Sequence, residues 1–322
     1  MKRLRELRKD KETRDKHSEV FFGADNFIYP YFVVEGIRVK EPIRSLYGIF
    51  HFSIDELLND LAETISLGIS RILLFGVIED SLKDEKGTSA GTPGNLVARA
   101  VKTIKQRYPE LTVITDVCLC GYTSHGHCGV ISQDTVENDP TLPLLAQMAL
   151  THAQAGADFT APSAMMDGQV ESIRKLLDSN GYHQTKILSY SAKYASGFYG
   201  PFRDAAHSAP SFGDRRSYQM DYRTIFQALE EVAADIAEGA DQVMVKPAHA
   251  YLDIIQRVKQ NFNDVPLVAY QVSGEYMMIK AAAEAGFMDE QRAMTEVLTA
   301  IKRAGADLII TYYAKDFLRI NN

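Results

Sequence analysis

The chain has 322 residues, of which 46% are apolar and 24% are charged, and its formal net charge is −7 at pH 7. This length suits one large α/β domain or two smaller domains. The acidic balance argues against broad binding to nucleic acid or to an anionic membrane, because such binding needs a basic surface. No apolar run reaches the roughly 18 residues of a membrane span. The charged start lacks the apolar core of a secretory signal, so we expect a cytoplasmic protein.

Residues 1–24 are highly charged and show no apolar period, so we interpret them as an N-terminal arm. Chain ends of this kind are usually solvated. The alternative is an arm that docks on a neighbouring subunit. No linker rich in Pro, Gly and Ser follows, so residues 25–322 are expected to form a single domain.

From residue 27 onward, short apolar segments alternate with longer amphipathic segments. Eight strands are predicted, at 27–34, 71–77, 111–119, 158–164, 186–191, 242–247, 267–273 and 308–313. Their continuous apolar character is typical of strands that are covered on both faces. Eight helices are predicted between them, at 54–67, 95–108, 142–155, 169–180, 222–238, 251–261, 275–285 and 289–304.

A short glycine turn joins several of these helices to the next segment. Gly156, Gly239, Gly286 and Gly305 each follow a predicted helix, where glycine readily adopts the left-handed conformation that ends it. Repeated strand–helix units of this kind predict a (β/α)8 TIM barrel, and an open doubly wound sheet is the alternative. No Gly-x-Gly-x-x-Gly follows the first strand, so dinucleotide binding has no support.

All three cysteines lie in one short stretch that follows the third strand. Cys118, Cys120 and Cys128 fall within eleven residues, and His125 and His127 lie between them. Soft ligands at such spacing indicate a site for a soft metal ion such as zinc, and three protein ligands leave one coordination position open. The histidines could also bind the ion, and a reduced cluster without metal is the alternative. The odd cysteine count argues against a disulfide framework.

Two lysines lie on apolar strands, where an unpaired charge is costly. Lys246 ends Val-Met-Val-Lys, and Lys193 ends Ser-Tyr-Ser-Ala-Lys on the preceding strand. Barrel enzymes keep their catalytic residues at these strand ends. Burial lowers the pKa of a lysine, and a neutral amine can form a Schiff base with a carbonyl compound. Lys246 is the candidate nucleophile unless it extends to the surface, and Asp116 is a candidate base.

The segment after Lys193 is too long for an ordinary connection in a barrel. Residues 198–219 include glycine, proline, aromatic residues and the arginines Arg203, Arg215 and Arg216. Long ordered loops often act as lids. Arginine binds a carboxylate through paired hydrogen bonds, so this segment predicts a lid over a carboxylate substrate. A solvated surface loop is the alternative.

Several segments are long enough to be specific: Asp116-Val-Cys-Leu-Cys, Tyr122-Thr-Ser-His-Gly-His-Cys-Gly129, Ser189-Tyr-Ser-Ala-Lys193, Phe198-Tyr-Gly-Pro-Phe-Arg-Asp204, Val243-Met-Val-Lys-Pro247 and Val272-Ser-Gly-Glu-Tyr276. Together they resemble the porphobilinogen synthases, also called 5-aminolevulinate dehydratases, from about residue 20 to 315. The resemblance implies a (β/α)8 barrel whose arm wraps a neighbour, usually in a homo-octamer. It also implies a lyase that joins two 5-aminolevulinate molecules into porphobilinogen, with loss of two waters, in tetrapyrrole (heme) biosynthesis.

The same resemblance implies roles for single residues. Lys246 would form a Schiff base with the first substrate, which supplies the propionate side of the product. Lys193 would hold the second substrate, and Asp116 would stand beside both amines. The residues that would bind substrate are Arg203, Arg215 and Gln219 for the second carboxylate, Ser273 and Tyr312 for the first, and Tyr199, Phe202, Ser163 and Tyr270 around them.

The resemblance also implies two metals. Zinc on Cys118, Cys120 and Cys128 would be catalytic, since this chain is of the cysteine type. Glu231 falls where some members bind an allosteric magnesium. One departure concerns Ala164 and Gln169, where many members have Asp and Arg. We interpret it as an ion pair that was replaced as a unit.

Two other functions remain open from the residues alone. A lysine-dependent aldolase would share the barrel but would need only one lysine and no metal. A zinc-stabilised binding module would have no reason to place two lysines at the ends of apolar strands.

Overall fold

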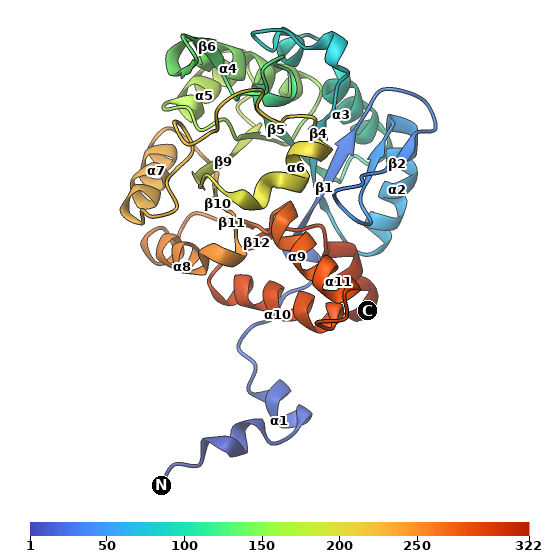
Figure 1. Ribbon diagram of the computed structural model, residues 1–322, viewed down its shortest axis with the longest axis vertical. Coiled ribbons are helices and arrows are strands. Elements are labelled where there is room, and N and C mark those ends of the chain that lie inside the picture. The colour runs from blue at the N-terminus through green and yellow to red at the C-terminus, as the bar shows by residue number, and fades with distance from the viewer. Residues whose placement is uncertain (322) are drawn as a thin grey trace.

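The computed structural model describes residues 1–321, and its centre is a closed barrel of parallel strands (Figure 1). In barrel order the strands are β1 (Phe27–Val33), β4 (Arg71–Gly76), β5 (Thr112–Val117), β8 (Phe159–Pro162), β9 (Lys186–Lys193), β10 (Gln242–Lys246), β11 (Leu267–Tyr270) and β12 (Leu308–Ile310). Pairing of Phe27 with Ile309 and of Ile28 with Ile310 closes the ring. The predicted barrel is therefore confirmed, and the open sheet is wrong.

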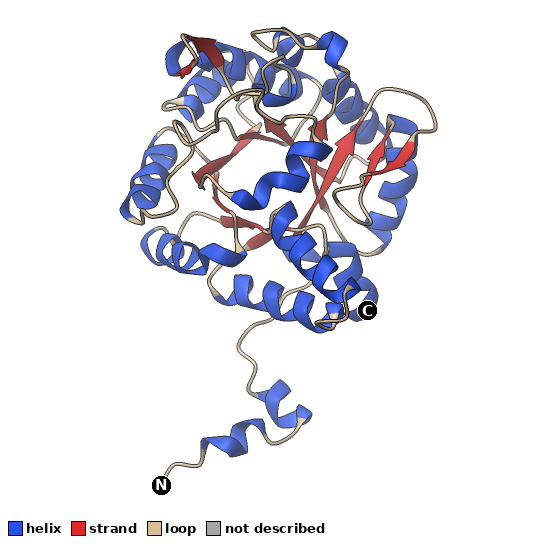
Figure 2. Ribbon diagram, in the orientation of Figure 1, coloured by secondary structure: helices blue, strands red, loops and turns tan. Residues whose placement is uncertain are grey.

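Helices surround this barrel on its outer side (Figure 2). They are α2 (Ile54–Ser66), α3 (Leu96–Arg107), α4 (Asn138–Gln154), α5 (Gln169–Ser179), α7 (Phe226–Ala237), α8 (Leu252–Asn261), α9 (Ser273–Glu284), α10 (Glu290–Arg303) and α11 (Ala314–Asn321). All the predicted helices are present. The helix predicted from 222 begins only at Phe226, because a turn at Asp221–Thr224 precedes it. The sequence did not predict α11.

The barrel strands are apolar because both of their faces are covered. Every residue of β1 is buried, and so are the inner residues of β4 and β10. The glycines predicted to end helices do so: Gly156, Gly239 and Gly305 have φ of 101°, 105° and 118°. These turns return the chain to the next strand on the same side of the barrel. All strands therefore present their carboxyl ends at one rim.

Two hairpins and a short helix lie on the side of that rim. β2 (Lys40–Pro42) and β3 (Phe50–Phe52) form a hairpin that extends the sheet beside β1, through Phe32↔His51 and Val33↔Phe52. β6 (Val130–Ser132) and β7 (Thr135–Glu137) form the second hairpin. The helix α6 (Gly200–Ala205) lies across the mouth of the barrel (Figure 1). These short elements were not predicted. The β2–β3 hairpin and α6 contact distant parts of the chain, whereas β6 and β7 pair only with each other.

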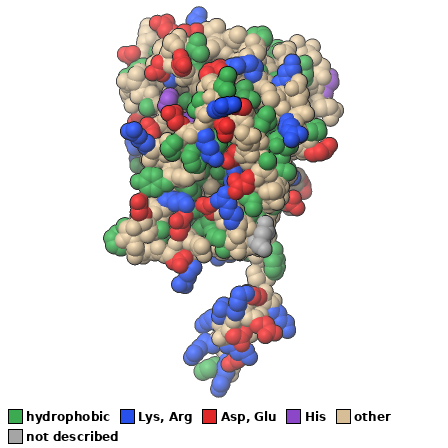
Figure 3. Space-filling model, turned by 90° about the vertical axis from the view of Figure 1, so that its right-hand side faces the viewer, with side chains coloured by type: hydrophobic (Ala, Val, Ile, Leu, Met, Phe, Trp, Pro, Cys, Tyr) green, Lys and Arg blue, Asp and Glu red, His purple; other side chains and the backbone are tan. Residues whose placement is uncertain are grey.

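The N-terminal residues project away from the barrel (Figures 1 and 3). They contain a short 3-10 helix at Leu4–Arg8 and α1 (Lys11–Lys16), with no buried residue in either. Phe22 fixes the base of this segment, because its ring stacks on Phe317 at 4.9 Å. Among the described helices, none combines the length and the apolar character needed to cross a membrane.

Candidate active site

Lys246 and Lys193 lie side by side at the barrel rim. They are paired neighbours on adjacent parallel strands, at the last residues of β10 and β9. Adjacent strands are about 4.8 Å apart, so the two side chains start from neighbouring positions. Their exposures are only 4% and 5%. The structure therefore brings two buried amines into one small space.

A bulge in β9 makes this pairing possible. Between Ser189↔Val243 and Ala192↔Val245, β9 advances by one residue more than β10. Side chains on a regular strand alternate between faces, so Tyr190 and Lys193 would point to opposite sides without the extra residue. Instead, the Tyr190 ring lies under both amines, 5.5 Å from Lys193 Nζ and 4.9 Å from Lys246 Nζ. The role of Tyr190 was not predicted from the sequence, since a bulge has no local signal.

Aromatic rings surround Lys246. The centroids of Tyr270, Phe202 and Tyr199 lie 4.2, 5.0 and 5.4 Å from its Nζ. Burial lowers the pKa of Lys246 well below its usual value, and the nearby charge of Lys193 lowers that pKa further. A lysine in this setting is a neutral nucleophile at lower pH than a solvated one.

Lys193 is held differently. Its Nζ donates a hydrogen bond to the carbonyl oxygen of Ser163, at the end of β8. Asp116 lies on β5, the strand beside β8, opposite Ala161. Burial raises the pKa of Asp116 to about 6, and the nearby Cys120 also raises it, whereas Lys193 and Lys246 lower it. Ser163 and Asp116 therefore lie on the same side of the rim as the two amines.

The lid helix α6 closes over Lys246. The Phe202 ring packs on Phe75 at 4.9 Å and on Phe32 at 5.8 Å. Its backbone N–H donates to Ser273 Oγ at 2.9 Å. A side chain at Gly274 would meet the Phe198 carbonyl oxygen at 2.5 Å, so the lid approaches this residue too closely for a Cβ atom. The lid is therefore docked on the first turn of α9.

Three lid residues predicted to bind a carboxylate gather in one place. Arg203, Arg215 and Gln219 line a single cavity of about 660 Å³. Within residues 1–321, Nε of Arg203, Nε of Arg215 and both polar atoms of the Gln219 amide have no hydrogen-bond partner. Buried polar atoms are costly unless paired, so they mark a place for a polar ligand. Neither lysine lines this cavity, because the rings of Tyr199 and Phe202 cover Lys246.

Ser273 and Tyr312 follow β11 and β12, the two strands that come after β10 in the barrel. Ser273 begins α9, where free backbone N–H groups favour an anion. The Tyr312 hydroxyl lies 3.3 Å from that of Tyr270, whose ring contacts Lys246. Both residues are buried. Ser273 is therefore linked to the lid through Phe202, and Tyr312 is linked to Lys246 through the Tyr270 ring.

The three cysteines form a compact, buried group. Their Sγ atoms lie within 4.8 Å of one another, and those of Cys118 and Cys120 are 3.3 Å apart. Three thiol groups at such distances suit a soft metal ion. The arrangement fits a metal site at the same rim as the lysine pair, because Cys118 follows β5 directly.

The two histidines of the same loop do not join this group. His127 contacts the lid instead, through Tyr218 Oη at 3.1 Å, the Phe212 carbonyl oxygen at 3.0 Å and the Phe212 ring. His125 contacts the carbonyl oxygen of Glu85. Their suggested role as metal ligands has no support in this geometry, because their ring nitrogens are used to dock the loop.

Glu231 lies on α7, outside the barrel. It lines a small cavity of about 150 Å³ together with Asp167, Asp235 and Glu238. Burial raises the pKa of Glu231 to about 7, and the charges of Asp235 and Asp167 add to this effect. This acidic cavity is separate from the lysines and the cysteines.

The fold and the rim define a (β/α)8-barrel enzyme with two buried amines and an adjacent thiol cluster. The family model "Delta-aminolevulinic acid dehydratase" matches residues 1–320. The dehydratase of Bacillus subtilis is 49% identical over 314 residues, covering 98% of this chain and 96% of that protein. The dehydratase of Halalkalibacterium halodurans is 51% identical over 318 residues, covering 99% and 96%.

A solved structure agrees with these matches. The delta-aminolevulinic acid dehydratase of Toxoplasma gondii, in complex with the reaction product porphobilinogen, has a TM-score of 0.96 at 41% identity. The match covers 99% of this chain and 91% of that one. The chain belongs to the delta-aminolevulinic acid dehydratase family. It is a lyase with porphobilinogen synthase activity, so the aldolase and the binding module are both wrong.

Proposed function

We propose that Lys246 is the residue on which the first 5-aminolevulinate reacts. Its amine attacks the ketone carbon, a C–N bond forms and water leaves, which gives a Schiff base. The observation that carries this proposal is the in-register pairing of Lys246 with Lys193 in a buried, aromatic setting. Ser273 and Tyr312 would bind the carboxylate of this substrate, since Ser273 offers a hydroxyl group and a helix N-terminus.

The second substrate would be held by Lys193 and by the lid. Arg203, Arg215 and Gln219 would bind its carboxylate, which would satisfy their orphaned polar atoms. Ser163, Tyr199, Phe202 and Tyr270 would form the walls around both ketones. Holding two reactants together replaces a bimolecular step, and this is the main contribution of such a site. Asp116 would act as a base beside the two amines.

Zinc is the metal that the donor set favours. Cys118, Cys120 and Cys128 would hold it, because three buried thiols are soft ligands. A zinc ion with an open coordination position would supply Lewis-acid chemistry beside the second substrate. The acidic cavity at Glu231 offers oxygen ligands, which suit magnesium, so we assign it as the candidate allosteric site.

Self-association is the expected state of this protein. Residues 1–24 form an arm and residues 25–322 a single catalytic barrel. Eight basic and five acidic side chains make the arm positive, whereas the whole chain has a net charge of −7. Leu4 and Leu7 of the arm are exposed. An arm of this kind suits the acidic surface of a second copy, as in a homo-octamer.

One experiment tests the central role of Lys246. Borohydride is added to the enzyme in the presence of 5-aminolevulinate, and the modified peptide is identified by mass spectrometry. We expect the added mass on Lys246. The Lys246→Ala variant should lose at least a factor of about 10³ in porphobilinogen formation, since the covalent route is removed.

The matched control is Lys186→Ala, because Lys186 is an exposed lysine at the other end of β9. It should keep both activity and trapping. Full porphobilinogen formation by Lys246→Ala would contradict the proposal. Zinc is tested separately: chelation should remove one ion per cysteine group and abolish activity, and added zinc should restore both.

A further inference from the structure

The barrel has a weak seam between β1 and β12. The two strands pair only through Phe27↔Ile309 and Ile28↔Ile310. Beyond this point β1 pairs with β3 instead, and the pairing of β12 with β11 also ends at Ile310. Thr311 still contacts both sides, because its N–H donates to the Ile28 carbonyl oxygen at 3.3 Å and its Oγ1 lies 2.5 Å from Gln271 Oε1. Tyr312 and Tyr313 follow it, beyond the last strand pairing.

Ring contacts and one long hydrogen bond hold the Tyr312 side chain. It packs on Phe32, Tyr270 and Tyr276 at centroid distances of 6.4, 6.4 and 5.5 Å. Its only hydrogen bond among the described residues is the 3.3 Å contact with the Tyr270 hydroxyl. Tyr312 also lines a cavity of about 280 Å³ that opens at the seam. The structure therefore leaves room for the ring to move unless its backbone is fixed from elsewhere.

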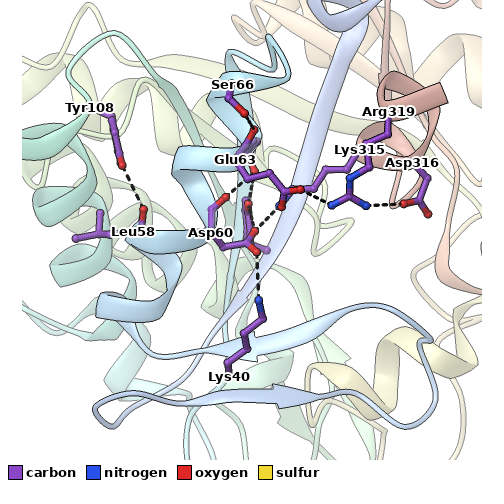
Figure 4. Close-up of polar contacts among 11 residues, drawn as sticks. Lys40, Leu58, Asp60, Glu63, Ser66, Tyr108, Lys315, Asp316 and Arg319 are labelled. Atoms are coloured by element: carbon purple, nitrogen blue, oxygen red, sulfur yellow. Dashed lines mark hydrogen bonds and ion pairs between the residues drawn. The ribbon is translucent and has the colours of Figure 1, made fainter. Parts of the chain in front are cut away.

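The next helix supplies this anchor. α11 begins at Ala314, and its first turn carries Lys315, whose side chain is only 7% exposed. The Lys315 amine contacts the Asp60 carboxylate and lies 3.5 Å from Glu63 on α2. One turn later, Arg319 contacts Glu63 at 2.5 Å. Figure 4 shows both cations of α11 pointing across the seam toward α2.

Asp60 is the centre of this network. Besides Lys315, its carboxylate accepts a hydrogen bond from the Tyr31 hydroxyl at 2.6 Å. Lys40 lies 3.7 Å from the same carboxylate (Figure 4). The Tyr31 hydroxyl also contacts Thr64 Oγ1 at 2.5 Å. The Asp60 side chain is 12% exposed, so its ion pair with Lys315 is little screened by solvent. A pair of this kind fixes geometry, because neither charge can be left alone without cost.

We propose that Lys315 and Asp60 are positioning residues for Tyr312. Their ion pair ties the first turn of α11 to α2. This fixes the backbone that follows Tyr312, so that the Tyr312 hydroxyl faces the carboxylate of the first substrate. The proposal rests on the proposed function, in which Tyr312 binds that carboxylate. Neither positioning residue touches substrate.

The test compares two ketones trapped on Lys246 by a short pulse of borohydride. 4-Oxopentanoate has the ketone and the carboxylate of the substrate, whereas 2-pentanone lacks the carboxylate. For Lys315→Met we expect the half-saturating concentration of 4-oxopentanoate to rise about tenfold, because one charge-assisted contact is lost. That of 2-pentanone should stay unchanged. Asp60→Asn should raise the half-saturating concentration of 4-oxopentanoate to a similar extent, and the double variant should raise it no further than either single variant. Lys315→Arg should restore the affinity for 4-oxopentanoate.

The matched control is Lys259→Met. Lys259 pairs with Asp307 at 2.8 Å at the opposite end of β12, and it should leave both ketones unaffected. If Lys315→Met and Asp60→Asn weaken both ketones equally, or neither, the positioning role is wrong. Tyr312→Phe separates the two levels of inference. If it leaves 4-oxopentanoate binding unchanged, the carboxylate role of Tyr312 itself fails, and positioning fails with it. If it weakens binding while the two network variants do not, only positioning fails.

Discussion

At the scale of single residues, two buried ionisable groups of this protein differ in their role: Lys246 belongs to the active site, and His152 does not. Lys246 has aromatic rings on several sides, which attract an ammonium ion, whereas burial and Lys193 disfavour it. The net effect lowers its pKa, which suits a nucleophile. His152 on α4 is fully buried, and neither ring nitrogen has a hydrogen-bond partner among residues 1–321. His152 has no part in the active site, so the free-energy cost of burying it without a hydrogen-bond partner lowers the stability of the fold.

His152 should make the protein less stable in mild acid. Burial lowers its pKa from 6.5 to about 3. Below pH 6.5 the unfolded chain takes up a proton at this residue and the folded chain does not, so stability falls as pH falls. Between pH 7.5 and 5.0 the loss should be about 2 kcal/mol. Urea unfolding of the wild type and of His152→Leu at both pH values measures it.

The difference between the two proteins isolates His152 from other titrating groups. His17→Leu is the control, because His17 is exposed on the arm. Equal pH dependence of the wild type and His152→Leu would show that the histidine is paired, for example by a buried water.

At the scale of elements, the cysteine loop and the lid form one unit. Arg215 donates to the carbonyl oxygens of Gly126 at 2.9 Å and of Ser208 at 2.6 Å. The backbone N–H of Ser211 donates to the carbonyl oxygen of His125 at 2.9 Å. A metal ion that fixes the loop should therefore also fix the lid.

Removal of the metal should loosen the lid. Without the ion, the loop that accepts from Arg215 and Ser211 becomes more mobile, so the lid opens more often. We expect trypsin to cleave after Arg216, an exposed lid residue, at least about threefold faster in chelated enzyme than in zinc-loaded enzyme. Peptide mapping over time measures the rate. The control is cleavage after Arg14 on the arm, which should not change, and equal lid cleavage with and without metal would contradict the coupling.

The connection from β8 to α5 carries Ala164 and Gln169, where the family resemblance implies Asp and Arg in many members. Ala164 is fully buried, and Gln169 is 3% exposed at the start of α5. An Asp at 164 would be a buried carboxylate without a cation. Ala164→Asp should therefore lower the free energy of unfolding by about 3 kcal/mol.

Ala164→Asp/Gln169→Arg should recover most of this loss, because the pair is then complete. Chemical denaturation of both variants at one protein concentration measures it. A neutral effect of Ala164→Asp alone would count against the interpretation that an ion pair was replaced as a unit.

At the scale of the whole molecule, residues 1–19 of the arm do not pack on the barrel. Phe22 is where it joins the barrel. A charged helix of six residues such as α1 has little stability alone in water. We therefore expect the arm to dock on a second copy of the chain.

Deletion of residues 1–20 should reduce the assembly to smaller species while the barrel stays folded, because Phe22 and its contact with Phe317 are kept. Sedimentation velocity at several concentrations measures the assembly, and circular dichroism measures the fold. The control is Lys2→Ala/Arg3→Ala, which removes charge at the tip but keeps Leu4 and Leu7. An unchanged sedimentation coefficient after the deletion would contradict the role of the arm.

Much of this molecule follows from local patterns. Apolar runs and glycine turns predicted the eight barrel strands and the helices between them, since burial on both faces leaves a local mark. The lysines were also predicted, because polar residues on apolar strands are conspicuous, and so were the clustered cysteines and the arginines of the unusually long loop. Tyr190, the hairpins at the rim and α11 were not predicted.

The sequence by itself determined the barrel, its family and the groups at its rim, because hydrophobic periodicity and rare residues are visible along the chain. Only the tertiary structure decided how these groups meet. The bulge in β9 sets Tyr190 beneath both lysines, His127 faces the lid rather than the cysteines, and Lys315 reaches Asp60 across the seam. These are contacts between residues far apart in the chain. Strand register and packing determine these contacts, and no local sequence pattern predicts either one.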